Sequence, residues 1–282
     1  MKKSVLVPAA LLAALLGAIF LFFAPHKLQQ ETAVVAPITA PVADPVSTAP
    51  HYPLIPTPET APEQAPETRE GEIEPAATAA TEDADTLRTR LLTLLGGPGE
   101  KSKLLILENF IPRFVVTIDN LTNRDLPRKQ LPVKGAPGSF QVQGTLEEES
   151  IHPANALRYT SFVELAESFD SRELVNLYAR LYPEFQKAYE NLGKPDSYFN
   201  DRLIAVIDHL LATPEPAEPI RLQRPKILYQ YADAELERRS SGQKILLRVG
   251  AENRARIKSK LSECRAELLK RVSTPTLETP AR

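Results

Sequence analysis

Residues 170–193 read DSRELVNLYARLYPEFQKAYENLG and carry the clearest structural signal in the chain. Asp170 with Glu173 three residues later is typical of a capping box, and Gly193 is typical of a helix end. Between them, residues at steps of three and four predict one buried helix face made of Leu174, Leu177, Tyr178, Leu181, Tyr182, Phe185, Tyr189 and Leu192. We interpret the tyrosines as core residues rather than a ligand-stacking surface. Pro183 is expected to bend this helix, because proline removes a backbone hydrogen bond.

Two helices are predicted earlier in the chain. Asp85 is placed to cap a short helix with leucines at 87, 91, 94 and 95, which stops at Gly96. An apolar repeat from Leu104 to Leu121 predicts the second. Pro112 interrupts that repeat, so we expect either a kink or a helix start near it.

Prolines and capping residues delimit the other predicted helices. One opens at Pro153, with Leu157, Phe162, Leu165, Ala166 and Phe169 facing inward. Asp196 or Ser197 caps the next, whose inward residues are Phe199, Leu203, Val206, Ile207 and Leu210. A short acidic helix is predicted around residues 233–239, and a turn is predicted at 240–242. An apolar stretch follows at 245–247. A last helix over 251–272 has a seam of Ile257, Leu261, Cys264 and Leu268.

A short β element interrupts this pattern. Phe140 and Val142 alternate with polar residues, which is typical of a half-buried strand. Its partner is expected at 220–222 or at 227–229. The sequence therefore predicts a mainly α domain over residues 86–272, with about six to seven helices and a minor β element, followed by a disordered tail at 273–282. Cys264 is the one cysteine of the chain, and its place in a helix seam predicts a buried, unreactive thiol.

The N-terminus predicts a membrane anchor. After Lys2 and Lys3, an uncharged apolar run extends over residues 4–24. A helix of that length covers about 30 Å, the thickness of a bilayer core. The alternative is a cleaved signal peptide, but its apolar region is usually shorter, and Phe22 is too bulky for a cleavage site. Because the lysines precede the run, residues 1–3 are expected in the cytoplasm and the chain beyond residue 24 in the periplasm, on a single-pass inner-membrane protein.

Residues 25–85 predict a disordered linker. They contain eleven prolines and eleven acidic residues, against only Lys27 and Arg69 as basic ones. A segment of this composition buries too little apolar area to offset the entropy of ordering. We interpret it as a spacer between membrane and domain.

A homodimer through the anchor is a further hypothesis. Ala9, Ala13 and Gly17 repeat every four residues and would let two helices approach closely. The alternative, that alanine is simply common in such anchors, is favoured because this motif is weak.

Several blocks of the chain resemble one known family. They are the segments FVVTIDNL at 114–121, PANALRY at 153–159, LYP at 181–183, YFNDRL at 198–203, IDHLL at 207–211 and GQKILLR at 242–248. These blocks are similar to those of a proteobacterial family known as Domain of Unknown Function 3014, over roughly Leu104 to Leu269. The resemblance implies a membrane-anchored envelope protein of a Gram-negative cell. It implies no activity, because the family has no assigned catalytic or binding residues.

No motif for phosphate binding, zinc binding or a nucleophile elbow occurs in the sequence, so we expect no catalytic residues, cofactor or metal. The best polar cluster lies on the helix after Tyr198, where Asp201 and Asp208 are two turns apart on one face. With a nearby histidine they would suit acid–base work or a divalent cation. The favoured alternative is a solvated face, or carboxylates paired to Arg158 or Arg221. The candidate binding face is therefore Asp201, Asp208, His209, Arg202, Asn200 and Arg158.

Charge divides the chain into an acidic spacer and a basic C-terminal third. After residue 85 there are thirty Lys and Arg against twenty-five Asp and Glu, with most of the excess between Arg221 and Arg271. Such a surface suits anionic partners: phospholipid headgroups, an acidic protein or the chain's own spacer. The alternative is a charged exposed helix without a ligand. No nucleic-acid partner is expected across a membrane. The sequence thus favours a non-enzymatic interaction module that contacts an envelope protein or the cell wall, with an envelope enzyme as the alternative.

Overall fold

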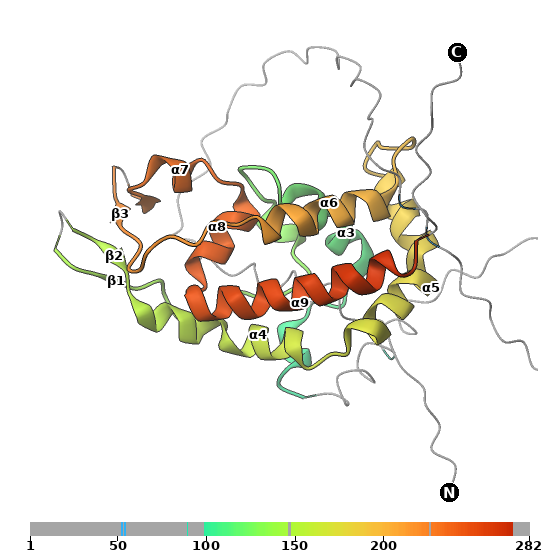
Figure 1. Ribbon diagram of the computed structural model, residues 1–282, viewed down its shortest axis with the longest axis horizontal. Coiled ribbons are helices and arrows are strands. Elements are labelled where there is room, and N and C mark those ends of the chain that lie inside the picture. Colours follow the sequence, from blue (N-terminus) through green and yellow to red (C-terminus); the bar gives the residue numbers. More distant parts are fainter. Residues whose placement is uncertain are drawn as a thin grey trace, which may run out of the picture.

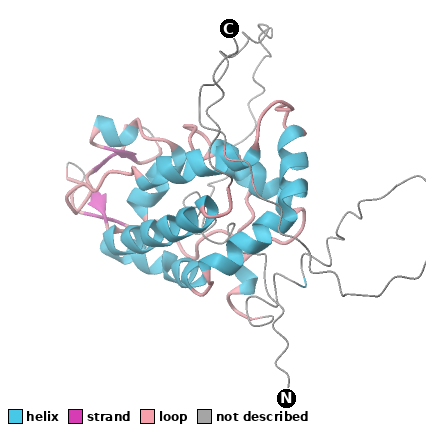
Figure 2. Cartoon of the chain, turned by 45° about the vertical axis from the view of Figure 1, so that its right-hand side comes forward, coloured by secondary structure: helices cyan, strands magenta, loops and turns pink. Residues whose placement is uncertain are grey.

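The computed structural model describes residues 99–145, 148–225 and 227–272, together with Tyr52, Leu54 and Thr89. Within these residues the chain is mainly helical, as predicted, with two short strand pairs at one end (Figures 1 and 2). The helices are α3 (Phe110–Asn120), α4 (Thr160–Glu167), α5 (Ser171–Glu190), α6 (Phe199–Leu211), α7 (Ala234–Glu237), α8 (Ser241–Arg248) and α9 (Ala251–Leu269).

Helix α9 runs through the middle of the domain, between α6 on one side and α4 on the other (Figure 1). Its predicted seam is confirmed, because Ile257, Leu261, Cys264 and Leu268 are all buried. It also packs on α5, and α3 closes the far side of α5 and α6. These five helices therefore share one apolar core.

Aromatic side chains fill that core, as the sequence predicted. The ring of Phe185 stacks on Phe199 at 5.8 Å and meets Phe114 edge-on at 5.4 Å. Tyr178 and Tyr189 are buried in the same group. Leu192 is an exception, since 40% of it is exposed beyond the end of α5.

Helix α5 begins as predicted, with the Asp170 carboxylate accepting the Glu173 N–H at 2.9 Å, and it continues through Pro183. The cap predicted for α6 is wrong. Neither Asp196 nor Ser197 caps it, because the Phe199 N–H donates to Gln186 Oε1 at 2.8 Å, from α5.

The prediction of a helix that starts at Leu104 is also wrong, while the alternative prediction of a helix start near Pro112 is confirmed. Helix α3 begins at Phe110, so Pro112 occupies its first turn, where a backbone N–H has no intrahelical partner in any case. Leu104 instead ends a short 3₁₀ helix, η1 (Ser102–Leu104), and the buried Leu105 after it forms an antiparallel bridge with Val133.

Residues 153–159 form a 3₁₀ helix, η3 (Pro153–Tyr159), before α4 begins. The prediction that Leu157 faces inward is wrong, since 76% of it is exposed. A 3₁₀ helix has 3.0 residues per turn, so the face extrapolated backward from α4 does not continue through it. Asn155 and Tyr159 are buried instead.

The β element is larger than predicted. Strand β1 (Val142–Gln143) pairs with β2 (Ser150–Ile151), so the predicted partners at 220–222 and 227–229 are wrong. Residues 220–222 lie at the other side of β2, where the Leu222 N–H donates to the Glu149 carbonyl at 2.7 Å. Strand β3 (Leu222–Gln223) then pairs with β4 (Gln230–Tyr231). These strands cover a second small core of Ile151, Ile220, Leu222, Tyr231, Leu236 and Leu247.

The turn predicted at 240–242 is the start of α8. Ser240 is its N-cap and accepts the Gln243 N–H at 3.2 Å. Gly242 sits where α8 meets α3 and α6, because its N–H donates to the Leu121 carbonyl at 3.0 Å.

The predicted anchor at 4–24, the linker at 25–85 and the tail at 273–282 lie outside the described residues, apart from Tyr52 and Leu54. Of the predicted 87–95 helix only Thr89 is described. Within the described part, none of the helices combines the length and apolar character needed to cross a membrane.

Replacing Gly242 with alanine should lower the free energy of unfolding by about 1–3 kcal/mol, because this site is already filled. A Cβ atom there would lie 2.7 Å from Leu210 Cδ2 and 2.9 Å from the Leu121 carbonyl oxygen. Urea unfolding measures the change. The matched control is Gly135→Ala, where a Cβ meets no atom within 4 Å. Equal stability of the two variants would contradict the packing argument.

Candidate functional site

Helix α6 holds five of the six predicted candidate residues, and it directs them to different partners. Asp208 lies near its C-terminal end and pairs with Arg265 of α9 through both carboxylate oxygens, one of them 3.1 Å from a terminal guanidinium nitrogen. The partner is therefore neither Arg158 nor Arg221. This bidentate pair joins α6 to α9 and raises the pKa of Arg265.

Arg202 joins α6 to α3. Its Nε lies 3.0 Å from Asp119 Oδ1, and a terminal nitrogen donates to Thr122 Oγ1 at 2.7 Å. Lys194 binds the same Asp119 oxygen at 2.7 Å. Two cations thus neutralise one carboxylate at the end of α3.

His209 joins α6 to the cap of α8. Its Nε2 lies 2.7 Å from Ser240 Oγ, the oxygen that also accepts the Gln243 N–H. Burial lowers the pKa of His209, and the positive charges of Arg202 and Arg239 lower it further. The neutral imidazole is therefore favoured.

Asn200 and Asp201 form hydrogen bonds with the backbone of Tyr52, which lies far earlier in the sequence. Asp201 Oδ1 accepts the backbone N–H of Tyr52 at 2.7 Å, and the Asn200 amide donates to the Tyr52 carbonyl at 2.7 Å. Leu54 then forms an antiparallel bridge with Val272 and packs against the main core. We call Asn200, Asp201 and Val272 the backbone clamp.

The clamp lies near two tyrosines of α5, the half-buried Tyr182 and the buried Tyr178. Burial raises the pKa of Tyr182 to about 12, and the negative charge of Asp201 adds to the rise. Burial also raises the pKa of Tyr178, with further contributions from Tyr182 and Asp201. These hydroxyls stay protonated at neutral pH, so none of them is a base there.

Arg158, the sixth candidate, lies elsewhere. Its guanidinium donates to the carbonyls of Pro137 at 2.9 Å and Gly138 at 3.0 Å, and so holds the loop before β1 against η3. The predicted candidate residues therefore do not form one site. Across the described ranges, moreover, no three His, Cys, Asp or Glu side chains gather closely enough to hold a metal ion.

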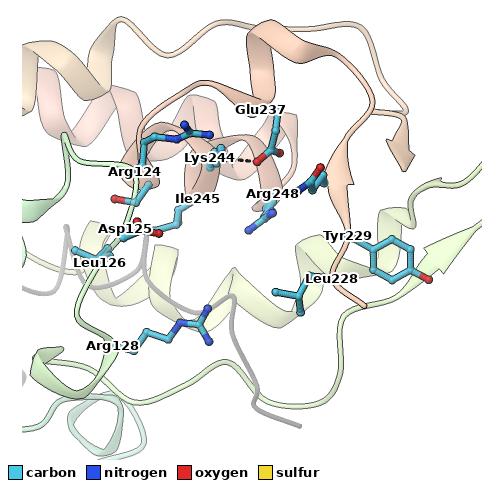
Figure 3. A pocket seen from close by; sticks show the side chains of 12 residues that line it. Arg124, Asp125, Leu126, Arg128, Leu228, Tyr229, Glu237, Lys244, Ile245 and Arg248 are labelled. Atoms are coloured by element: carbon cyan, nitrogen blue, oxygen red, sulfur yellow. Dashed lines mark hydrogen bonds and ion pairs between the residues drawn. The ribbon is translucent and has the colours of Figure 1, made fainter. Parts of the chain in front are cut away.

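Sequence reasoning missed a pocket of about 290 Å³ beside α8. Figure 3 shows Arg124, Arg128 and Arg248 around one hollow, with Lys244 in contact with Glu237. We call these three arginines and their hollow the arginine pocket. The excess of basic residues in the C-terminal third pointed to this region, but Arg124 and Arg128 come from a distant loop.

A family model described as "Protein of unknown function (DUF3014)" matches residues 110–265. The chain belongs to this family. The predicted resemblance is thereby confirmed, and the matched range contains the α6 residues of the clamp and the arginine pocket. No curated protein and no solved structure matches the sequence.

Asp201→Ala should release the Tyr52 segment from the DUF3014 domain, because the Tyr52 N–H loses a charged acceptor. Hydrogen exchange at Tyr52 in the full chain should become about tenfold faster or more, as expected for losing such a bond. Asp201→Asn keeps an acceptor oxygen and should retain most of the protection. Asp196→Ala changes an exposed carboxylate just before α6 and is the matched control. Unchanged exchange in Asp201→Ala would contradict the clamp.

His209 should make the stability of the DUF3014 domain depend on pH. Its folded-state pKa lies below the unfolded value of 6.5, so the unfolded chain binds the proton first as pH falls. The stabilising contribution is present above pH 6.5 and is lost as pH falls through the folded pKa. Urea unfolding at about pH 7.5 and about pH 5.5 should therefore show a larger loss for the native chain than for His209→Gln. Equal losses would contradict this assignment.

Proposed function

We propose that this DUF3014 protein is a single-pass inner-membrane protein that presents a non-enzymatic binding domain in the periplasm. Residues 4–24 serve as the anchor, with residues 1–3 in the cytoplasm. The length of the apolar run and the position of Lys2 and Lys3 support this orientation. The partner is an envelope protein or a cell-wall peptide.

The observation that carries the proposal is the backbone clamp. Asn200 and Asp201 contact a donor and an acceptor of one residue, Tyr52, rather than its side chain. Paired main-chain contacts of this kind recognise an extended polypeptide, while a neighbouring apolar contact such as that of Leu54 selects among sequences. In this state the occupant is the chain's own linker.

The enzyme alternative has less support. An acid–base pair needs carboxyl groups that face a common substrate position, with a base in reach. Asp208 instead pairs with Arg265, and His209 contacts Ser240. Each candidate group therefore already joins two elements of the fold.

Cell fractionation tests the membrane part of the proposal. The full chain should stay in the membrane pellet after alkaline extraction, and a variant lacking residues 4–24 should become soluble. Protease added to spheroplasts should digest the domain in the full chain. A domain protected until the inner membrane is lysed would contradict the periplasmic orientation.

The same cells test the binding part. A photo-crosslinking residue at Tyr198, a half-exposed position immediately before α6, should capture an envelope polypeptide or a wall peptide. Capture should rise in Tyr52→Pro/Leu54→Gly, because proline removes the backbone N–H that Asp201 accepts and glycine removes the apolar contact of Leu54, so the internal occupant is weakened. It should fall in Asn200→Ala/Asp201→Ala. If the amount of captured partner is the same in the native chain and in both variants, the backbone clamp is not the binding surface.

A further inference from the structure

The arginine pocket lies at the end of the domain opposite the backbone clamp. The clamp is at the start of α6 and beyond the end of α9, whereas α8 precedes the start of α9 (Figure 1). Arg248 is the last residue of α8, Arg124 lies in the segment that follows α3, and Arg128 begins a 3₁₀ helix, η2 (Arg128–Gln130). Three arginine side chains from two distant segments thus line one hollow (Figure 3).

Arg248 is held rigidly at the base of this pocket. Only 5% of it is exposed, and its guanidinium lies over the ring of Tyr231, 5.2 Å from the centroid. Tyr231 is fixed in turn by donating its hydroxyl to the Lys244 carbonyl at 2.9 Å. An arginine braced in this way loses little conformational entropy when it binds a ligand.

The pocket gathers positive charge. Lys244 is paired with Glu237 at 2.5 Å, and Glu237 also accepts the Tyr231 N–H at 2.9 Å. Of the other charged lining residues, three are arginines and one is an acid, Asp125. Burial lowers the pKa of Arg128, and the like charge of Arg248 lowers it further, because two neighbouring cations repel each other. An anion between them would relieve that repulsion.

One side of the pocket is apolar and exposed. The turn between β3 and β4 carries Ile227 and Leu228, which are 68% and 67% exposed, and Leu228 also lines the pocket. In the same turn the Arg224 guanidinium lies 5.4 Å from the centroid of the Tyr229 ring. Aliphatic, aromatic and basic side chains together at a loop tip are typical of a surface that enters the interface of a membrane.

We infer that the arginine pocket binds the phosphate of an anionic phospholipid headgroup, while Ile227 and Leu228 enter the lipid interface beside it. Guanidinium groups bind phosphate oxygens in pairs, and the surface of an anionic leaflet attracts basic side chains. The chain's own acidic linker offers carboxylates to the same arginines, but it gives no reason for two exposed aliphatic side chains at the rim. The inference rests on the proposed anchor, which keeps the domain near the lipid.

The linker is long enough for this contact. Residues 25–51 number twenty-seven between the predicted anchor and Tyr52. At about 3.3 Å per residue their greatest span is about 90 Å. Helix α9 has nineteen residues and is therefore about 28 Å long. The domain can turn its pocket end to the bilayer even though its linker is clamped at the other end.

A fluorescent label at the rim tests the inference in the full chain. Ile227→Cys, labelled with an environment-sensitive dye and inserted in lipid nanodiscs, reports whether the turn enters lipid. Cys264 should not react, because it is buried and burial raises its pKa to about 11. The discs contain phosphatidylcholine alone or with phosphatidylglycerol. A third sample has neutral discs with soluble glycerol 3-phosphate.

Emission should shift to shorter wavelength only in discs with the anionic lipid. Arg124→Gln/Arg128→Gln should lower the ratio of docked to undocked chains about 25-fold, since each basic residue near such a surface contributes about fivefold. Both arginines are exposed, so the fold should survive. The matched control, Arg172→Gln/Arg180→Gln, removes two exposed charges from α5 and should leave the shift unchanged.

Four results would overturn the inference. An equal shift in neutral and anionic discs would mean insertion without headgroup recognition. A response to glycerol 3-phosphate with none to the lipid would assign the pocket to a soluble anion. The emission wavelength could also change when Glu67, Glu70 and Glu72 are replaced with glutamine and stay the same when the lipid is changed. That result would assign the arginine pocket to the chain's own linker. A chain that fails to enter discs at all contradicts the proposed anchor, whereas an inserted chain without a shift contradicts this inference alone.

Discussion

The burial of α9 among α4, α5 and α6 is the constraint on which the rest of this structure depends. The helix has a narrow apolar seam, so its sides are charged and must find partners where the neighbouring helices approach. Lys260, nearly buried, donates to the Phe169 carbonyl at 2.7 Å beyond the end of α4. Lys258 donates to the Thr213 carbonyl at 2.7 Å beyond the end of α6. A cation at a helix C-terminus is favourable there, because the last carbonyls carry partial negative charge.

The polar face of α6 follows from the same constraint. Its charged residues connect helices that the apolar core has already brought together: Asp208 reaches α9, Arg202 reaches α3 and His209 reaches α8. Such pairs contribute little stability each where they are exposed to solvent. The buried apolar face of α6 sets the rotation of the helix about its axis, and with that rotation Asn200 and Asp201 reach Tyr52.

The two ends of the domain therefore have different chemistry. At the clamp end, single hydrogen bonds of 2.7 Å hold a peptide backbone next to an apolar contact. At the pocket end, repelling arginines lie beside exposed aliphatic residues. A domain with the proposed polypeptide site at one end and the proposed phospholipid site at the other would suit a protein that connects a membrane to a second component. The proposed function depends on this separation of the two sites.

Periodicity and capping in the sequence by themselves determined the mainly helical class, the buried faces of α5 and α9 and the start of α5, because these depend on residues within a few positions of one another. They misplaced Leu157, since the change from 3.6 to 3.0 residues per turn leaves no local signal. Only the tertiary structure decided that Asp201 meets Tyr52, that Asp208 meets Arg265 and that Arg128 meets Arg248. Those pairs are separated by tens to more than a hundred positions. Which side chains meet across such distances depends on how whole helices pack, and packing is a property of the assembled core that no short segment contains.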